Sequence, residues 1–121
     1  MSDKQKLVIT LTVSPKDDNA TVAFTVANAA LGKGMDVGVF LASDGVENSR
    51  TGSCDFTHVT PFKKLSELVR TFGENGGVIW SCAPCFNHRG LNAGEVVAGT
   101  VITGAAPMLD WVQSGAATLN F

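Results

Sequence analysis

Two hydrophobic patterns follow each other along the chain. Short apolar runs rich in β-branched residues predict buried strands, and between them lie segments whose apolar residues recur at helical spacing. The first run is nearly continuously apolar, which is typical of a strand covered on both faces of a sheet. The predicted strands are Leu7–Val13, Val37–Ala42, Val78–Ser81, Val96–Ile102 and Ala117–Phe121.

Three segments have the apolar spacing of helices. In the first, Val22, Val26 and Ala29 lie one turn apart with small alanines beside them, a face suited to lying flat on a sheet. We expect Asp18 or Asn19 to cap this helix. Pro61 occupies a favourable first position for the second helix. The predicted helices are Ala20–Lys33, Phe62–Glu74 and Ala106–Gln113, and the polar segment 47–60 is predicted to be a long surface loop that can hold a short helical turn.

The alternation of strands and helices predicts an α/β fold. Strands that are joined through helices pair in parallel and leave helices on both faces of their sheet. We therefore expect a three-layer α/β/α sandwich with a mostly parallel sheet of about five strands. A chain of 121 residues is the usual length of one domain, so residues 1–121 are predicted to form a single domain.

Composition and charge exclude several classes of protein. A net charge of −2, only 7% aromatic residues and the absence of Tyr argue against a nucleic-acid partner. No apolar run approaches the ~20 residues of a membrane helix, and the start of the chain resembles a strand rather than a signal peptide. Three cysteines are too few for a secreted disulfide scaffold, so we expect a cytoplasmic protein with reduced thiols.

Ligands of open α/β sheets bind beyond the carboxyl ends of the strands. Ser14 follows the first predicted strand, and Asp44 lies in the turn after the second. The third strand is followed at once by Cys82 and Cys85. The sequence therefore predicts a site at this edge of the sheet, with Ser14 and Asp44 as candidate binding residues. Asp44 is equally well suited to a purely structural role in its turn.

The CxxC segment has the residue types of a reactive thiol site. A helical turn after the strand would point free N–H groups at a sulfur and favour its thiolate. His88 and Arg89 lie about one helical turn beyond Cys85 and would add positive potential. Cys82 and Cys85 are therefore the candidate catalytic residues, and His88 and Arg89 the candidate binding residues, of a site that holds a low-pKa sulfur or a persulfide.

Other interpretations of the cysteines stay open. Free cysteines are often buried and inert, and a CxxC also fits a thioredoxin-type dithiol. A structural zinc site would use Cys54, His58, Cys82 and Cys85, although no metal or other cofactor is our first expectation. A non-enzymatic module that binds a small ligand, with incidental thiols, is a further alternative.

Taken together, the chain resembles the DsrE/DsrF-like family, sulfur-relay proteins with the YchN-like fold. The resemblance is carried by the segments 20–34, 39–46, 75–85, 104–105 and 109–121. It implies that Cys82, shortly before the pair Arg89-Gly90, bears a persulfide as a sulfurtransferase or sulfur carrier. It also implies a homo-oligomer, trimer or hexamer, and a sulfur donor or acceptor protein as partner. Cys85 departs from most sulfur-relay members and could serve as a resolving thiol.

Overall fold

The computed structural model describes residues 4–121; residues 1–3, included in the predicted domain, lie outside the described residues. Five strands form one sheet in the order β4-β3-β2-β1-β5, and every neighbouring pair is parallel. The strands are β1 Lys6–Leu11, β2 Asp36–Leu41, β3 Val78–Cys82, β4 Thr100–Thr103 and β5 Ala117–Asn120. The predicted parallel sheet of about five strands is confirmed.

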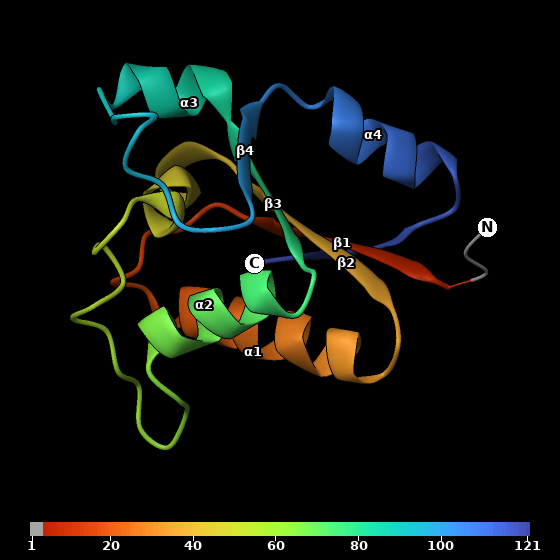
Figure 1. Cartoon of the computed structure of the whole chain (residues 1–121), viewed down its shortest axis with the longest axis horizontal. Helices are drawn as coiled ribbons and strands as arrows, with labels where there is room; N and C mark the ends of the chain where they lie inside the picture. Colours follow the sequence, from red (N-terminus) through yellow and green to blue (C-terminus); the bar gives the residue numbers. More distant parts are fainter. Residues whose placement is uncertain (1–3) are drawn as a thin grey trace.

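Helices cover both faces of this sheet, as predicted (Figure 1). Helices α1, Asp18–Gly32, and α2, Leu65–Glu74, lie side by side on one face. Helix α4, Ala106–Gln113, lies on the other face. The short helix α3, Ala83–His88, follows β3 directly at the carboxyl edge of the sheet. The three-layer α/β/α sandwich is therefore the observed architecture.

The main core lies between the sheet and the α1–α2 layer. Phe24 of α1 meets Phe72 of α2 edge to face, with ring centroids 5.9 Å apart. The face of α1 that packs inward is centred on Phe24 and its alanine neighbours, while Val22 and Val26 are half-buried and Ala29 is exposed. The small alanines let α1 approach the sheet closely. The buried face of α1 is therefore the one with Phe24 and the alanines, and the predicted face, centred on Val22, Val26 and Ala29, is turned partly away from the sheet.

A smaller core lies between the sheet and α4. It is built from Val8, Phe40 and Trp80, and Trp111 of α4 packs on Trp80 with ring centroids 5.0 Å apart. Gly38 of β2 leaves room for the Trp80 ring, since a Cβ atom there would lie 2.3 Å from it. No residue of α4 is fully buried, so this layer covers its face thinly. Within residues 4–121, no helix has the length and apolar character needed to cross a membrane.

Two predictions about helix starts were wrong. Asp17, rather than Asp18 or Asn19, caps α1, and its carboxylate accepts the N–H of Asn19 at 2.8 Å. Helix α2 begins at Leu65 rather than at Phe62, because the chain first turns where the Phe62 N–H donates to the Val59 carbonyl. The segment 47–60 begins inside a short 3-10 helix, η1, Ser43–Ser49, and continues mostly as turns, in agreement with a predicted loop that holds a short helical turn.

The fourth strand is shorter than predicted. Only Thr100–Thr103 pairs with β3, whereas the prediction began this strand at Val96. The preceding residues pair elsewhere: the Val97 N–H donates to the Ser49 carbonyl, and the Thr51 N–H donates to the Glu95 carbonyl. Residues 95–98 therefore lie against the loop after η1 rather than in the sheet.

Candidate functional site

Parallel strands bring the segments after β2 and β3 to one edge of the sheet. η1 begins two residues after β2, and α3 begins directly after β3, so the two short helices pack against each other. Gly45 fixes η1 on the end of β1, because a Cβ atom there would lie 2.0 Å from the Leu11 carbonyl oxygen. Ser43 opens η1 with a φ of 53°, a left-handed conformation that a non-glycine residue seldom adopts. The close packing of η1 against β1 holds Ser43 and Asp44 beside α3.

Arg89 and Asp44 join these two segments. The Arg89 Nη2 and Nε groups both donate to Oδ1 of Asp44, at 2.8 and 3.2 Å. The Arg89 Nη1 group donates to the Cys85 carbonyl oxygen at 3.1 Å. Arg89 is thus held at two points, and it keeps the end of α3 against the start of η1. The structure brings together two candidate residues that are far apart in sequence.

The two thiols of the CxxC segment lie at the junction of β3 and α3. Cys82 is the last residue of β3 and precedes the first residue of α3, while Cys85 lies in the first turn of that helix. Both cysteines are half-buried, and neither forms a disulfide. Both thiols are therefore partly open to solvent and lie close enough to interact with each other.

The surroundings of the two sulfurs differ. The Cys82 thiol lowers the pKa of Cys85 by hydrogen bonding, the Ser43 backbone N–H lowers it further, and the Arg89 charge adds to this. Burial raises the pKa of Cys82. The pair ionises first at Cys85, with Cys82 as its hydrogen-bond donor.

The remaining candidate residues lie in other surroundings. Ser14 belongs to a turn before α1, where its hydroxyl accepts the Lys16 N–H at 3.3 Å and its carbonyl accepts the Asp17 N–H. His88 is exposed at the end of α3. Neither residue contributes to the pKa shifts of the two thiols.

The zinc alternative requires four ligands to converge. Cys54 is 5% exposed and lies against the buried Asn48, and His58 bonds the Phe62 carbonyl oxygen in an exposed loop. Among residues 4–121, no group of three or more Cys, His, Asp or Glu side chains is placed to hold a metal ion. The set of Cys54, His58, Cys82 and Cys85 is therefore not assembled, and burial raises the pKa of Cys54 to about 11.

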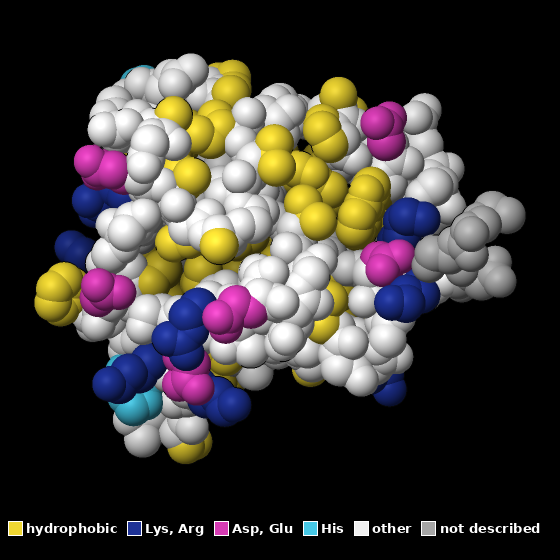
Figure 2. All heavy atoms as spheres, in the orientation of Figure 1, with side chains coloured by type: hydrophobic (Ala, Val, Ile, Leu, Met, Phe, Trp, Pro, Cys, Tyr) yellow, Lys and Arg dark blue, Asp and Glu magenta, His cyan; other side chains and the backbone are white. Residues whose placement is uncertain are grey.

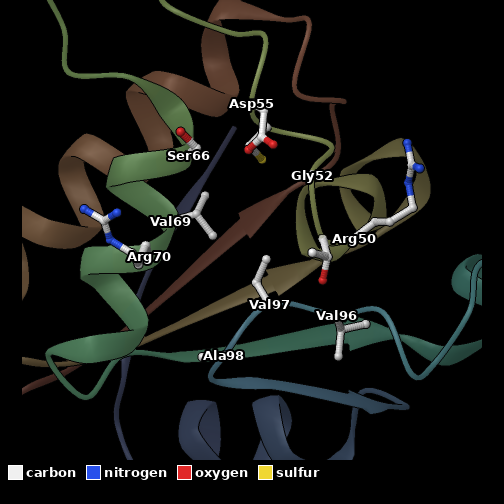
Figure 3. A pocket seen from close by; sticks show the side chains of 11 residues that line it. Arg50, Gly52, Asp55, Ser66, Val69, Arg70, Val96, Val97 and Ala98 are labelled. Atoms are coloured by element: carbon white, nitrogen blue, oxygen red, sulfur yellow. The ribbon is translucent and has the colours of Figure 1, made fainter.

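A cavity of about 540 Å³ lies away from the thiols, between α2, the loop after η1 and residues 96–98 (Figure 3). Val69 and Val97 face its interior, and Asp55 and Ser66 stand at its upper side in this view. Sequence reasoning missed this cavity, because its walls come from three segments with no shared motif. It also missed the Ser43 backbone, since a turn signal does not show where an N–H group points.

The profile of the DsrE/DsrF-like family matches residues 5–121. The chain belongs to this family. The match covers nearly the whole chain, so the resemblance seen in the sequence is confirmed.

Two relatives come from methanogenic archaea. An uncharacterized protein of Methanocaldococcus jannaschii is 30% identical over 106 residues, which cover 88% of this chain and 38% of the relative. The chain thus spans little more than a third of that relative's length. An uncharacterized protein of Methanopyrus kandleri is 28% identical over 109 residues, covering 88% of this chain and 87% of the relative.

Solved structures share the fold at low sequence identity. YchN of Escherichia coli superposes with a TM-score of 0.80 and 16% identity, covering 98% of this chain and 99% of YchN. The protein MTH1491 of Methanobacterium thermoautotrophicum gives a TM-score of 0.70 and 17% identity, covering 98% of this chain and all of its own. These likenesses establish the YchN-like fold of this DsrE/DsrF-like chain.

Proposed function

We propose that this chain handles sulfane sulfur in the reducing cytosol, carrying or relaying it as a persulfide on Cys82, with Cys85 as the resolving thiol. One observation carries the proposal: a thiol and a more acidic thiol lie in contact, half-exposed, at the carboxyl edge of a parallel sheet. Membership of a sulfur-relay type of family supports it. The resemblance assigns the persulfide to Cys82.

The arrangement supplies a base for loading Cys82. The Cys85 thiolate takes the proton of the Cys82 thiol, and the Cys82 sulfur attacks the terminal sulfur of a thiol persulfide, R–S–SH. The bond from Cys82 to that sulfur forms as the donor's S–S bond breaks. The products are the Cys82 persulfide, a neutral Cys85 thiol and the thiolate RS⁻.

The resolving step uses the same two sulfurs. After Cys85 releases its proton to water, its thiolate attacks Sγ of the Cys82 persulfide and displaces hydrosulfide, HS⁻. A Cys82–Cys85 disulfide forms, and the sulfane sulfur is reduced by the electrons that the two cysteines lose. A thiol reductant returns the pair to its starting state. In relay, the thiolate of an acceptor protein attacks the terminal sulfur instead.

Intact mass spectrometry after incubation with polysulfide tests the persulfide. We expect the wild-type chain and the Cys54→Ser variant to gain the mass of one sulfur atom, because Cys54 is buried with a raised pKa. The Cys82→Ser variant should gain none, and Cys85→Ser should keep its adduct longer because the resolving thiol is gone. An adduct that persists in Cys82→Ser would contradict the assignment of the persulfide to Cys82.

We also propose that the chain works as a homo-oligomer, a trimer or hexamer, and exchanges sulfur with a donor or acceptor protein. The thin α4 layer supports self-association, since it leaves large apolar side chains of that layer and the sheet edge in contact with water. Figure 2 shows apolar side chains gathered over α4.

The cavity favours a second candidate function, the binding of a small ligand with incidental thiols. Its volume and apolar lining fit a small-molecule site. Anilinonaphthalene sulfonate is a suitable probe, because its fluorescence rises in apolar surroundings. This function requires that Val97→Phe, which fills the cavity, reduces the signal and that Cys82→Ala does not. Equal fluorescence of Val97→Phe and wild type would exclude ligand binding in this cavity.

A further inference from the structure

The guanidinium of Arg89 is engaged on both sides. Nε and Nη2 both donate to Oδ1 of Asp44, and Nη1 donates to the Cys85 carbonyl oxygen. An arginine has five N–H donors in a fixed fork, so these contacts occupy its carboxylate-binding side. An anion that approaches the thiols can bind Arg89 through that side only by displacing Asp44.

Asp44 also brings its own charge close to the thiols, because it directly follows Ser43, whose backbone N–H bonds Cys85. Its side chain is 63% exposed, while that of Arg89 is 22% exposed, so the carboxylate is the outer member of the pair. The position of Asp44 is fixed, because Gly45 seats η1 against Leu11 and leaves no room to shift inward. The carboxylate that neutralises Arg89 therefore stands on the solvent side of the ion pair.

We propose that Asp44 is a specificity-determining residue that directs the site to sulfane donors of low charge, such as persulfides of neutral thiol compounds, and away from multiply charged anions. The inference rests on the proposed persulfide function and names its substrate class. A dianionic donor is repelled by the Asp44 carboxylate and can bind Arg89 only by displacing Asp44. A donor with an uncharged body is subject to neither of these energetic penalties.

The transfer chemistry is the same for both kinds of donor. The Cys82 sulfur attacks the terminal sulfur of R–S–SH, the donor's S–S bond breaks, and RS⁻ departs with the bonding electrons. When R carries two carboxylates, the leaving thiolate is a trianion and departs past Asp44. The repulsion therefore acts on both the incoming and the outgoing molecule.

Two persulfides that differ in charge but share this chemistry test the inference. Loading of the full chain is timed by intact mass with hydroxyethyl persulfide, which has a neutral body, and with the persulfide of mercaptosuccinate, which has two carboxylates. We expect wild type to load from the neutral donor about tenfold faster, the order expected for a dianion near one charge in water. Added salt should reduce this preference.

Matched variants separate the charge of Asp44 from its geometry. Asp44→Asn keeps an oxygen that can accept from Arg89 but removes the charge, and it should lower the preference, taken as the ratio of the two donors' loading rates in the same variant, to about twofold. Asp44→Glu keeps the charge and should keep the preference. No preference in wild type, or a preference that survives in Asp44→Asn, would overturn the inference. Absence of loading from either donor would instead refute the proposed persulfide function.

Discussion

At the Cys82–Cys85 pair, contacts within a few ångströms decide which sulfur ionises. Cys85 receives hydrogen bonds from the Cys82 thiol and the Ser43 backbone and lies near the charge of Arg89, so its pKa falls. Cys82 is the donor, and burial raises its pKa. The two thiols of the pair therefore differ in acidity, and Cys85 is the more acidic of the two.

Alkylation with iodoacetamide, followed by peptide mass analysis, tests this division. A lowered pKa means that a larger fraction of Cys85 is thiolate at neutral pH, and the thiolate is the species that reacts. We expect Cys85 to be modified first, with its rate rising at lower pH than the rate of Cys82. Cys54, with a pKa of about 11 and little exposure, should stay unmodified in the folded chain.

The Cys82→Ala variant is the control for the alkylation experiment. It removes the principal hydrogen-bond donor to Cys85, so the pKa of Cys85 should rise and its alkylation at neutral pH should slow. Faster modification of Cys82 than of Cys85 in the wild-type chain would contradict the assignment.

Among the elements, η1 has the strictest steric demand. It passes so close to β1 that a Cβ atom at Gly45 would lie 2.0 Å from the Leu11 carbonyl oxygen. η1 also supplies Ser43 and Asp44 to the site, and its Ser49 hydroxyl lies 3.1 Å from that of Ser81 in β3. The position of the site therefore depends on the packing of this short helix.

Gly45→Ala should move η1 or strain its contact with β1. We expect it to lower the free energy of unfolding by about 1–3 kcal/mol, the usual cost of overpacking, as measured by urea denaturation. Gly32→Ala is the matched control, because nothing lies within 4 Å of a Cβ atom there and alanine favours helix α1. Its unfolding free energy should be unchanged or slightly raised. Equal stability of both variants would show that η1 is not held as tightly as described.

Across the whole molecule, the two faces of the sheet are covered unequally. Two helices bury one face, whereas α4 alone covers the other and leaves Leu109 50% exposed. Val101 of the edge strand β4 is 51% exposed and pairs with Trp80, so it points to the same face. Exposed apolar side chains that gather on one face are typical of a surface that another chain covers.

Sedimentation velocity tests self-association through this face. We expect the wild-type chain to sediment as a multiple of its 12.6 kDa mass and the double variant Val101→Lys, Leu109→Lys to sediment as a single chain. Leu119→Lys is the control, because Leu119 is 43% exposed but pairs with Ile9 and faces the α1–α2 side. A single-chain mass for wild type, or an oligomer that survives the double variant, would exclude this surface as the interface.

The sequence by itself determined the features that depend on local pattern. Continuous apolar runs such as those of β1 and β2 predict buried parallel strands, and the carboxyl edge of such a sheet predicts where Asp44, Cys82 and Cys85 gather. The combination of segments along nearly the whole chain, from the helix of residues 20–34 to residues 109–121, was also sufficient to indicate the family, which the profile match confirms.

Only the tertiary structure decided the features that depend on contacts between distant segments. The start of β4 follows from the bond between Val97 and Ser49, which no local pattern in either segment reveals. The ionisation order of the thiols follows from the hydrogen bond of the Cys82 thiol to Cys85, and then from where the Ser43 N–H and the Arg89 charge lie. Hydrophobic periodicity specifies which residues are buried, but a pKa depends on distances to groups that only the folded chain brings together.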